Sequence, residues 1–489
     1  MVQADGVEVD GALPVLAADG LTALQHRGTE SAGLVGSNGV DRDHLEIIKG
    51  HGLVRDVFLE ENLSKLNGSR IIIGHNRYST AGGKRKAINC VQPFVVYTAI
   101  GTVAISHNGE LVDAKKKRKE ALHQGVGLST DTDSELIAQM VAKAIALNYK
   151  CRNDENWGDI SKELAVTMSA INMSYSLLVM TYDRLYAIRD PYGNRPLCVG
   201  TIYDAENAIQ TPVAYCAASE SCALPGTAKL DFEVEPGEIV EISRKGIRSV
   251  FQMKPQTPQA ACIFEYVYFA RNDSIIEGQQ VQAVREECGR ILATESHADA
   301  DIISNVPDSS TAAAIGYAAQ VLVPARISLV FLMNPAFIET AMLDDRLYNR
   351  AMLCDSQRFT RNSVGVIRKN VEGRRIVLID DSIVRGNTMR ILVQMLLNAG
   401  AKEVHLRIAS PPVKFPCFMG INIPTREELL ASNKNLDQIT HHFGATSVAY
   451  LSVEGLQKAV QSGIERRANF DVGHCTACLT GKYPVPIDF

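Results

Sequence analysis

Residues 375–388 read RIVLIDDSIVRGNT, and they decide the fold of the second half of the chain. Positions 376–379 are all apolar, which is typical of a strand buried on both faces of a parallel sheet. The strand ends at Asp380 and Asp381, and a loop then opens into a helix that stops at Gly400. Acids at the end of such a strand can hold ribose hydroxyls, directly or through magnesium, and the helix start can hold a phosphate. An isolated Asp pair could equally cap a turn, but the whole loop favours a sugar-phosphate site.

The residues around this stretch predict a parallel sheet covered by helices. Apolar strands are followed by helical segments at 301–306 and 312–321, and again at 375–379 and 388–398. Such alternation is typical of an α/β domain.

The first half, residues 20–243, has a different pattern. It reads as short strands with alternating apolar positions, separated by turns rich in Gly and Asn, which predicts antiparallel sheets. Residues 176–180 and 185–188 are expected to pair as a hairpin.

The length of 489 residues is too great for one hydrophobic core and predicts two large domains. Residues 254–261 carry two prolines after the last strand expected in the first half. We therefore expect the domains to span residues 1–258 and 259–489.

Composition narrows the class of protein. Hydrophobic residues make up 46% and charged residues 21%, as in ordinary soluble globular proteins. A net charge of -5 argues against nucleic-acid binding, which needs uncompensated Lys and Arg. The one basic run, Lys115 to Lys119, is expected to be a solvated helix face. No apolar run is long enough for a membrane span and residues 1–10 do not resemble a signal peptide, so we expect a cytosolic protein with no membrane partner.

Residues 377–388 resemble the phosphoribosylpyrophosphate motif of type I phosphoribosyltransferases. In form the motif is most similar to that of the glutamine phosphoribosylpyrophosphate amidotransferases of purine synthesis. The resemblance implies that Asp380 and Asp381 bind ribose and Mg²⁺. It also implies that the loop cradles the 5-phosphate through Ser382, Arg385, Gly386, Asn387 and Thr388.

Other stretches of the second half carry the same resemblance. Residues 306–310 resemble the pyrophosphate loop, which would place Ser309 near the magnesium, although the sequence alone would also fit any strand-to-helix turn. Residues 262–271 resemble the interdomain strand. The family has a cation-rich mobile loop that closes over pyrophosphate. The corresponding residues 333–346 lack most of these cations and carry three acids instead, and Arg346 is the one candidate for a retained cation. This change would weaken the electrostatic stabilisation of the leaving group.

Four motifs of the first half resemble the glutaminase domain of the same family: residues 25–28, 74–80, 106–111 and 132–135, with a further signature at 190–197. Taken one at a time, these motifs could equally be strand residues, a hairpin turn and a helix cap. The spacing Thr132-x-x-Glu135 also predicts a capping box, with a helix start near Asp133. By resemblance, Arg77 would bind the carboxylate of glutamine and Asp133 its amino group. Asn108 and Gly109 would form the oxyanion hole.

The glutaminase nucleophile does not follow the family. The family uses a Cys at the mature N-terminus, whose own amine is the base, and the first cysteine here is Cys90. Asp5-Gly6-Val7 only faintly echoes the Cys-Gly-Val start. Three alternatives stay open: a start upstream of Met1, a catalytically silent homologue that assembles with or regulates an active enzyme, or a transferase that uses free ammonia.

Residues 473–478 read GHCTAC and place two of the eleven cysteines close enough to share a metal, although zinc or a redox pair would fit a lone Cys-x-x-Cys equally well. The resemblance implies that Cys262 and Cys417 join Cys475 and Cys478 as ligands of a 4Fe-4S cluster. The other seven cysteines are expected to be buried structural thiols.

The resemblance covers nearly the whole chain and implies its fold and activity. The fold would be an α+β N-terminal nucleophile glutaminase domain with antiparallel sheets, joined to an α/β type I phosphoribosyltransferase domain with a parallel sheet. The activity would be an amidophosphoribosyltransferase of purine synthesis, with glutamine and phosphoribosyl pyrophosphate as substrates. We also expect a homo-oligomer.

Overall fold

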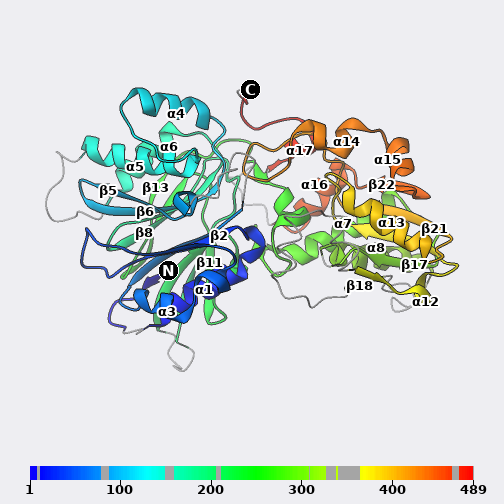
Figure 1. The fold of residues 1–489 in the computed structure, drawn as a ribbon, viewed down its shortest axis with the longest axis horizontal. Coiled ribbons are helices and arrows are strands. Elements are labelled where there is room, and N and C mark those ends of the chain that lie inside the picture. The colour runs from blue at the N-terminus through cyan, green and yellow to red at the C-terminus, as the bar shows by residue number, and fades with distance from the viewer. Residues whose placement is uncertain are drawn as a thin grey trace.

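A computed structural model describes residues 1–7, 11–78, 88–148, 159–204, 211–307, 309–325, 337–339, 364–464 and 473–487. Figure 1 shows two adjoining halves, one built from two stacked sheets and the other from a sheet surrounded by helices. Within these ranges no helix is long and apolar enough to cross a membrane.

The first half contains two sheets whose strands all pair antiparallel. The seven-stranded sheet has, in spatial order, β11 (Ala228–Glu233), β9 (Cys198–Tyr203), β10 (Pro212–Ala218), β1 (Val2–Gln3), β4 (Ile71–Arg77), β2 (Ser31–Ser37) and β3 (Glu46–His51). The six-stranded sheet has β13 (Gly246–Gln252), β12 (Glu238–Ser243), β8 (Arg184–Arg189), β7 (Tyr175–Met180), β6 (Gly101–Gly109) and β5 (Phe94–Thr98). The expected hairpin is confirmed, since β7 and β8 pair from Met180 and Leu185 outward.

Helices cover the outer faces of both sheets (Figure 1). Helices α5 (Asp133–Asn148) and α6 (Ser161–Ala170) bury side chains such as Ile137 and Leu164 against the six-stranded sheet. Helix α1 (Ala12–Ala23) buries Leu13 against the seven-stranded sheet. A third apolar cluster fills the space between the sheets. This four-layer packing leaves the strand ends free to carry a site.

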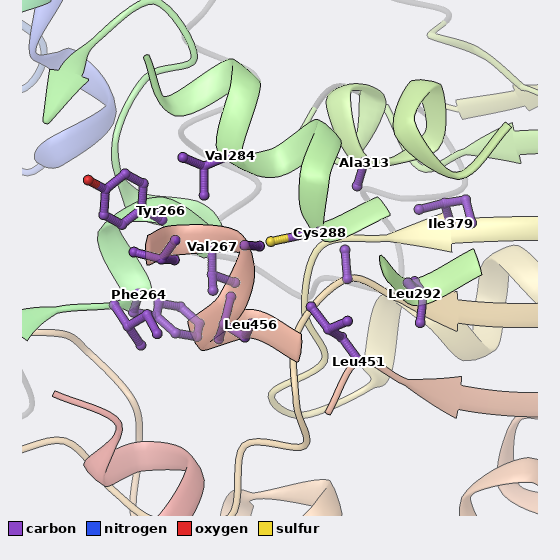
Figure 2. Close-up of a cluster of buried hydrophobic side chains, with 14 of the residues drawn as sticks. Phe264, Tyr266, Val267, Val284, Cys288, Leu292, Ala313, Ile379, Leu451 and Leu456 are labelled. Carbon is purple, nitrogen blue, oxygen red and sulfur yellow. The ribbon is translucent and has the colours of Figure 1, made fainter. Parts of the chain in front are cut away.

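The second half confirms the predicted parallel sheet. Its strands lie in the order β17 (Ile302–Asn305), β20 (Arg375–Asp380), β21 (Glu403–Ile408) and β22 (Ser447–Tyr450), all paired in parallel. The main helices are α7 (Val281–Glu295), α8 (Thr311–Ala325), α13 (Asn387–Asn398), α15 (Leu436–Phe443) and α16 (Val453–Gln461). Figure 2 shows Ile379 of β20 in one apolar cluster with Leu292 of α7, Ala313 of α8 and Leu456 of α16.

Short elements connect these layers. The helical ones are η1 (Gln25–Arg27), α2 (Val54–Val57), α3 (Glu60–Leu63), η2 (Ser64–Leu66), η3 (Ile88–Cys90), α4 (Ala114–His123), η5 (Ser221–Ala223), η6 (Glu265–Phe269), α12 (Arg368–Val371), η7 (Arg426–Glu428), α14 (Leu430–Asn433) and α17 (Ala477–Thr480). Three strand pairs are β14 (Ala261–Cys262) with β23 (His474–Cys475), β15 (Ile275–Ile276) with β16 (Gln279–Gln280), and β18 (Phe337–Glu339) with β19 (Val364–Val366).

Two local expectations need correction. Helix α5 begins at Asp133 as predicted, but the Glu135 carboxylate accepts from the backbone N–H groups of Ser129 and Thr130 rather than from Thr132, so the capping box is only half formed. Among the expected structural thiols, Cys222 is partly exposed, while Cys151 and Cys354 lie outside the described residues.

Candidate functional site

A cavity of about 250 Å³ lies where the two halves of the molecule meet. Its walls come from the end of β4, the end of β6 and the start of α5 in the first half. The second half contributes Phe269, the last residue of η6, and Gly420. Four residues implicated by the sequence resemblance line this cavity: Arg77 and Asp133, implied to bind glutamine, and Asn108 and Gly109, implied to form the oxyanion hole. We call the cavity the glutamine pocket after this implied role.

Arg77 and Asp133 present opposite charges to the glutamine pocket. The Arg77 guanidinium is buried and pairs with Glu30, with Nη1 3.1 Å from Oε1. The Asp133 carboxylate accepts a 2.9 Å hydrogen bond from the backbone N–H of Leu111, which fixes one of its oxygens. A zwitterionic amino acid has one group for each of these charges.

Asn108 and Gly109 end strand β6 beside each other. The Asn108 side chain donates to the Ser219 hydroxyl at 3.3 Å. Gly109 has φ of +144°, and a Cβ there would lie 2.2 Å from the Ser174 carbonyl oxygen, so only glycine fits. Next to them, the backbone of His107 is held from both sides by the Gln92 amide. This clamp fixes the end of β6.

Several residues of the glutamine pocket were missed by the sequence analysis. Arg118 belongs to the basic run that was expected to face solvent; three of its lysines do, but the Arg118 guanidinium donates to the carbonyl oxygens of Thr130 and Thr132 and lines the pocket. Burial and the nearby charge of Asp133 raise the pKa of Glu110 to about 7. Phe269 and Gly420 come from distant parts of the chain, so no local pattern points to them.

The pocket wall contains one thiol among the described residues that line it, and this is Cys90. The thiol is buried, and this burial raises its pKa, which opposes the thiolate form that a nucleophile needs. Asp5 lies in a different cavity and forms an ion pair of 3.0 Å with Arg244. The Asp5-Gly6-Val7 stretch therefore does not take the nucleophile's position.

The second set of predicted residues gathers at the carboxyl end of β20. Asp380 and Asp381 are adjacent carboxylates, and burial raises the pKa of both, with the charge of Asp381 adding to the rise at Asp380. The hydroxyls of Ser309 and Ser382 donate to Asp381. Ser309 follows β17, the strand that pairs with β20, so the sheet brings the two predicted loops together. Asp308 of the same loop lies outside the described residues.

The loop after the acids leads into α13. Gly386 is the residue before this helix and has φ of +78°, and a Cβ there would lie 2.9 Å from Leu430. Asn387 and Thr388 begin the helix, and the backbone N–H groups of such a first turn have no partner within the helix. Arg385 is exposed and pairs with Glu428 at 2.9 Å. Residues 333–346, which the sequence resemblance aligned with the loop that closes over pyrophosphate, lie outside the described residues except for 337–339.

The four predicted cysteine ligands come from three segments that meet between the halves. Cys262 and Cys475 are register partners in the β14–β23 pair. Cys417 contacts the same apolar cluster as Cys475, and Cys478 lies one turn further on in α17. Burial raises the pKa of all four thiols, to about 12 for Cys475.

The ligand set does not have the geometry of a single-ion site. Among the described residues, no three His, Cys, Asp or Glu side chains close around one point as the ligands of one metal ion do. A four-iron cluster spaces its thiolates more widely, because each one binds a different iron.

The first half carries the signature of a glutamine amidotransferase. A family model described as a glutamine amidotransferase domain matches residues 75–209, which include most of the pocket wall. Relatives of known name match nearly the whole chain. The amidophosphoribosyltransferase of Drosophila melanogaster is 48% identical over 482 residues, which cover 95% of this chain and 84% of the relative. The amidophosphoribosyltransferase of Mus musculus is 45% identical over 502 residues, which cover 96% of this chain and 93% of the relative.

Solved structures agree with this assignment. A structure described as the allosteric regulatory enzyme of purine biosynthesis is 36% identical with a TM-score of 0.82, covering 97% of this chain and 94% of that one. The glutamine phosphoribosylpyrophosphate amidotransferase of B. subtilis, complexed with ADP and GMP, is 35% identical with a TM-score of 0.80, covering 97% and 95%. This chain belongs to the amidophosphoribosyltransferase family.

Proposed function

We propose that this chain performs the amidophosphoribosyltransferase reaction of purine synthesis. With a nucleophilic Cys placed ahead of Met1, glutamine and water would give glutamate and ammonia in the glutamine pocket. Ammonia would then attack C1 of phosphoribosyl pyrophosphate, break the bond to the pyrophosphate oxygen and lose a proton, which gives 5-phosphoribosylamine. The observation that carries the proposal is the 45–48% sequence identity, over nearly the full length of this chain, with enzymes of this name.

The arrangement of the glutamine pocket supports the first half of the reaction. Arg77 and Asp133 would hold the carboxylate and amino group of glutamine, and this orients its side-chain amide toward the end of β6. The Asn108 side chain and the Gly109 N–H would stabilise the negative charge that develops on the amide oxygen. The covalent step calls for a thiolate, and an N-terminal Cys placed ahead of Met1 would reach this pocket, because β1 pairs antiparallel with β4 and an extension would run toward Arg77.

The second site supports phosphoribosyl transfer. Two adjacent acids with raised pKa values need a counter-charge, and Mg²⁺ with ribose hydroxyls would supply it. Ser382, Gly386, Asn387 and Thr388 would hold the 5-phosphate at the start of α13. Bound Mg²⁺ would neutralise charge on the departing pyrophosphate.

One segment connects the two sites. Phe269 of η6 lines the glutamine pocket, and η6 is held in place by Arg285, which donates to the carbonyl oxygens of Tyr266 and Ala270. The positive charge of Arg285 also opposes the rise that burial causes in the pKa of Asp381, so Arg285 acts on the second site as well. We propose that ammonia passes between the sites along this side of the interface.

We also propose that the four gathered cysteines hold a 4Fe-4S cluster. The donor set fits, since four cysteines converge from β14, β23, α17 and the loop after Pro416, and buried thiols of raised pKa are stabilised as thiolates when they bind iron. The cluster would hold these segments together at the interface.

The experiment is pyrophosphate release from phosphoribosyl pyrophosphate and Mg²⁺, with ammonium or glutamine as the nitrogen donor. Product formation with ammonium, lost in an Asp380→Asn/Asp381→Asn variant, supports the assignment. A chain that binds iron and glutamine but releases no pyrophosphate with either donor would favour the silent homologue.

A further inference from the structure

Arg195 is a buried cation without the hydrogen bonds that such a group needs. Its side chain is fully buried, yet Nε, Nη1 and Nη2 have no hydrogen-bond partner among the residues that the structure describes. Glu265 is a close charged neighbour, with its Oε1 2.7 Å from Nη2 as an ion pair without hydrogen-bond alignment. Burying a guanidinium with unused donors costs free energy unless another acceptor occupies the site.

The neighbours of Arg195 indicate where that acceptor lies. The backbone N–H of Cys262 donates to the carbonyl oxygen of Asn194, so strand β14 runs directly beside this residue. Cys262 is in turn the register partner of Cys475 in the β14–β23 pair, so two of the four converging cysteines lie on the strand pair beside Arg195.

The other side of Arg195 leads to the glutamine pocket. Glu265 pairs with Arg195 and also with Arg27, whose Nη2 is 2.8 Å from the same Oε1. Both guanidinium groups stack on Phe269, at 4.7 Å for Arg27 and 5.6 Å for Arg195. Arg27 and Phe269 line the glutamine pocket, so one carboxylate and one ring connect the cysteines to the pocket wall.

We propose that Arg195 is a positioning residue that donates to the sulfur atoms of the cysteine centre and, through Glu265, fixes Arg27 and Phe269 at the glutamine pocket. The inference rests on the proposed 4Fe-4S cluster. The centre is anionic, because four thiolates outweigh the charge of the iron–sulfur core, and it supplies the acceptors that Arg195 lacks in the described part of the chain. Glutamine binding then depends on the state of a centre that glutamine never touches.

The test compares the anaerobically purified full chain with Arg195→Gln and Arg195→Lys variants. Iron per chain, the midpoint reduction potential followed by electron paramagnetic resonance, and the Kd of glutamine by calorimetry are measured on each. We expect Arg195→Gln to shift the potential to more negative values, because a nearby cation favours the reduced and more negative cluster. We expect the same variant to bind glutamine at least ten-fold more weakly, and Arg195→Lys to restore the potential because it keeps the charge.

Arg407→Gln is the matched control, since Arg407 is also buried but donates to the carbonyl oxygens of Ser296 and Leu406 in the second half. If Arg195→Gln loses its iron while Arg407→Gln keeps it, the inference is supported. If both lose iron equally, the role of Arg195 is only structural and the inference is overturned. The inference is also overturned if the Arg195→Gln variant keeps its iron and shows the same reduction potential and the same Kd of glutamine as the parent chain. A parent chain without iron would instead refute the cluster itself.

Discussion

Gly420 packs directly against Gly109, although the two residues come from opposite halves of the molecule. A Cβ at position 420 would lie 2.7 Å from the carbonyl carbon of Gly109 and 3.1 Å from the backbone nitrogen of Glu110. Gly420 has φ of +90° and follows Cys417 by three residues. The loop that carries a proposed cluster ligand is therefore also part of the wall of the glutamine pocket.

Gly420→Ala should separate this wall from strand β6. The added methyl group has no room, and displacement of residues 109–111 would move the N–H of Leu111 away from Asp133. Overpacking of this kind costs about 1–3 kcal/mol, so glutamine binding should weaken by roughly 10-fold or more. Calorimetry with glutamine gives the change. Gly125→Ala is the control, because Gly125 has φ of +81° but open space around it. Equal losses in both variants would assign the effect to backbone strain alone.

Glu110 should make stability depend on pH. Its pKa is raised to about 7 by burial, with Asp133 adding to the rise, from an ordinary value of 4.5. A raised carboxyl pKa contributes stability below about pH 4.5 that is lost as pH rises through 7, since the folded state then holds a buried charge. Glu110→Gln should therefore raise the thermal midpoint at pH 8 more than at pH 5, by an amount worth at most about 3 kcal/mol. Glu120→Gln, on the surface of α4, should show no such difference. A pH-independent effect at position 110 would contradict the burial argument.

Replacing Asp380 and Asp381 with Asn should abolish Mg²⁺-dependent binding of phosphoribosyl pyrophosphate. Each carboxylate lost removes a charged ligand, and contacts of this kind contribute about 1.5–3 kcal/mol, so the double variant should bind at least 100-fold more weakly. Without Mg²⁺ at pH 8 the same variant should melt at a higher temperature, because two carboxyls whose pKa values are raised no longer have to ionise in the folded state. Calorimetry and thermal melts measure the two effects. Asp437→Asn, in the exposed first turn of α15, should change neither.

Glutamine hydrolysis should depend on a cysteine placed ahead of Met1. We expect no ammonia release from glutamine by the 489-residue chain, because the thiol in the described pocket wall, Cys90, is buried and its pKa is raised. A variant extended by about five residues, with Cys first and its amine free, should gain the activity, since an extension of β1 would follow β4 toward Arg77 at about 3.4 Å per residue. The same extension beginning with Ser is the control. Hydrolysis by the unextended chain would show that another group serves as nucleophile.

Much of the fold was predictable because its signals are local. The apolar strand at 376–379, the Asp pair after it and the hairpin between β7 and β8 each follow from the periodicity and turn residues of a few positions. Strand β20 lies inside the sheet, as its uninterrupted apolar run requires.

The site was predictable only in part, since its remaining members are brought together by tertiary packing. Arg118 sits in a run of lysines, three of which are exposed, and only its contacts with Thr130 and Thr132 show that it faces inward. Gly420 and Phe269 enter the glutamine pocket from the other half of the chain. The half-formed capping box at Thr132 was likewise not predictable from local spacing. The Glu135 carboxylate accepts from the N–H groups of Ser129 and Thr130 in the preceding loop instead of from the N–H of Thr132.

The pairing of β14 with β23 also sets an order of events during synthesis. Cys262 emerges from the ribosome long before its register partner Cys475, whereas every strand of the two antiparallel sheets precedes both. The first half can therefore fold while translation continues, as domains generally do. Strand β14 cannot pair until its partner strand, near the end of the chain, has been synthesised. Cys262 therefore has no strand partner in the nascent protein, and the β14–β23 contact can form only after residue 475 has been translated.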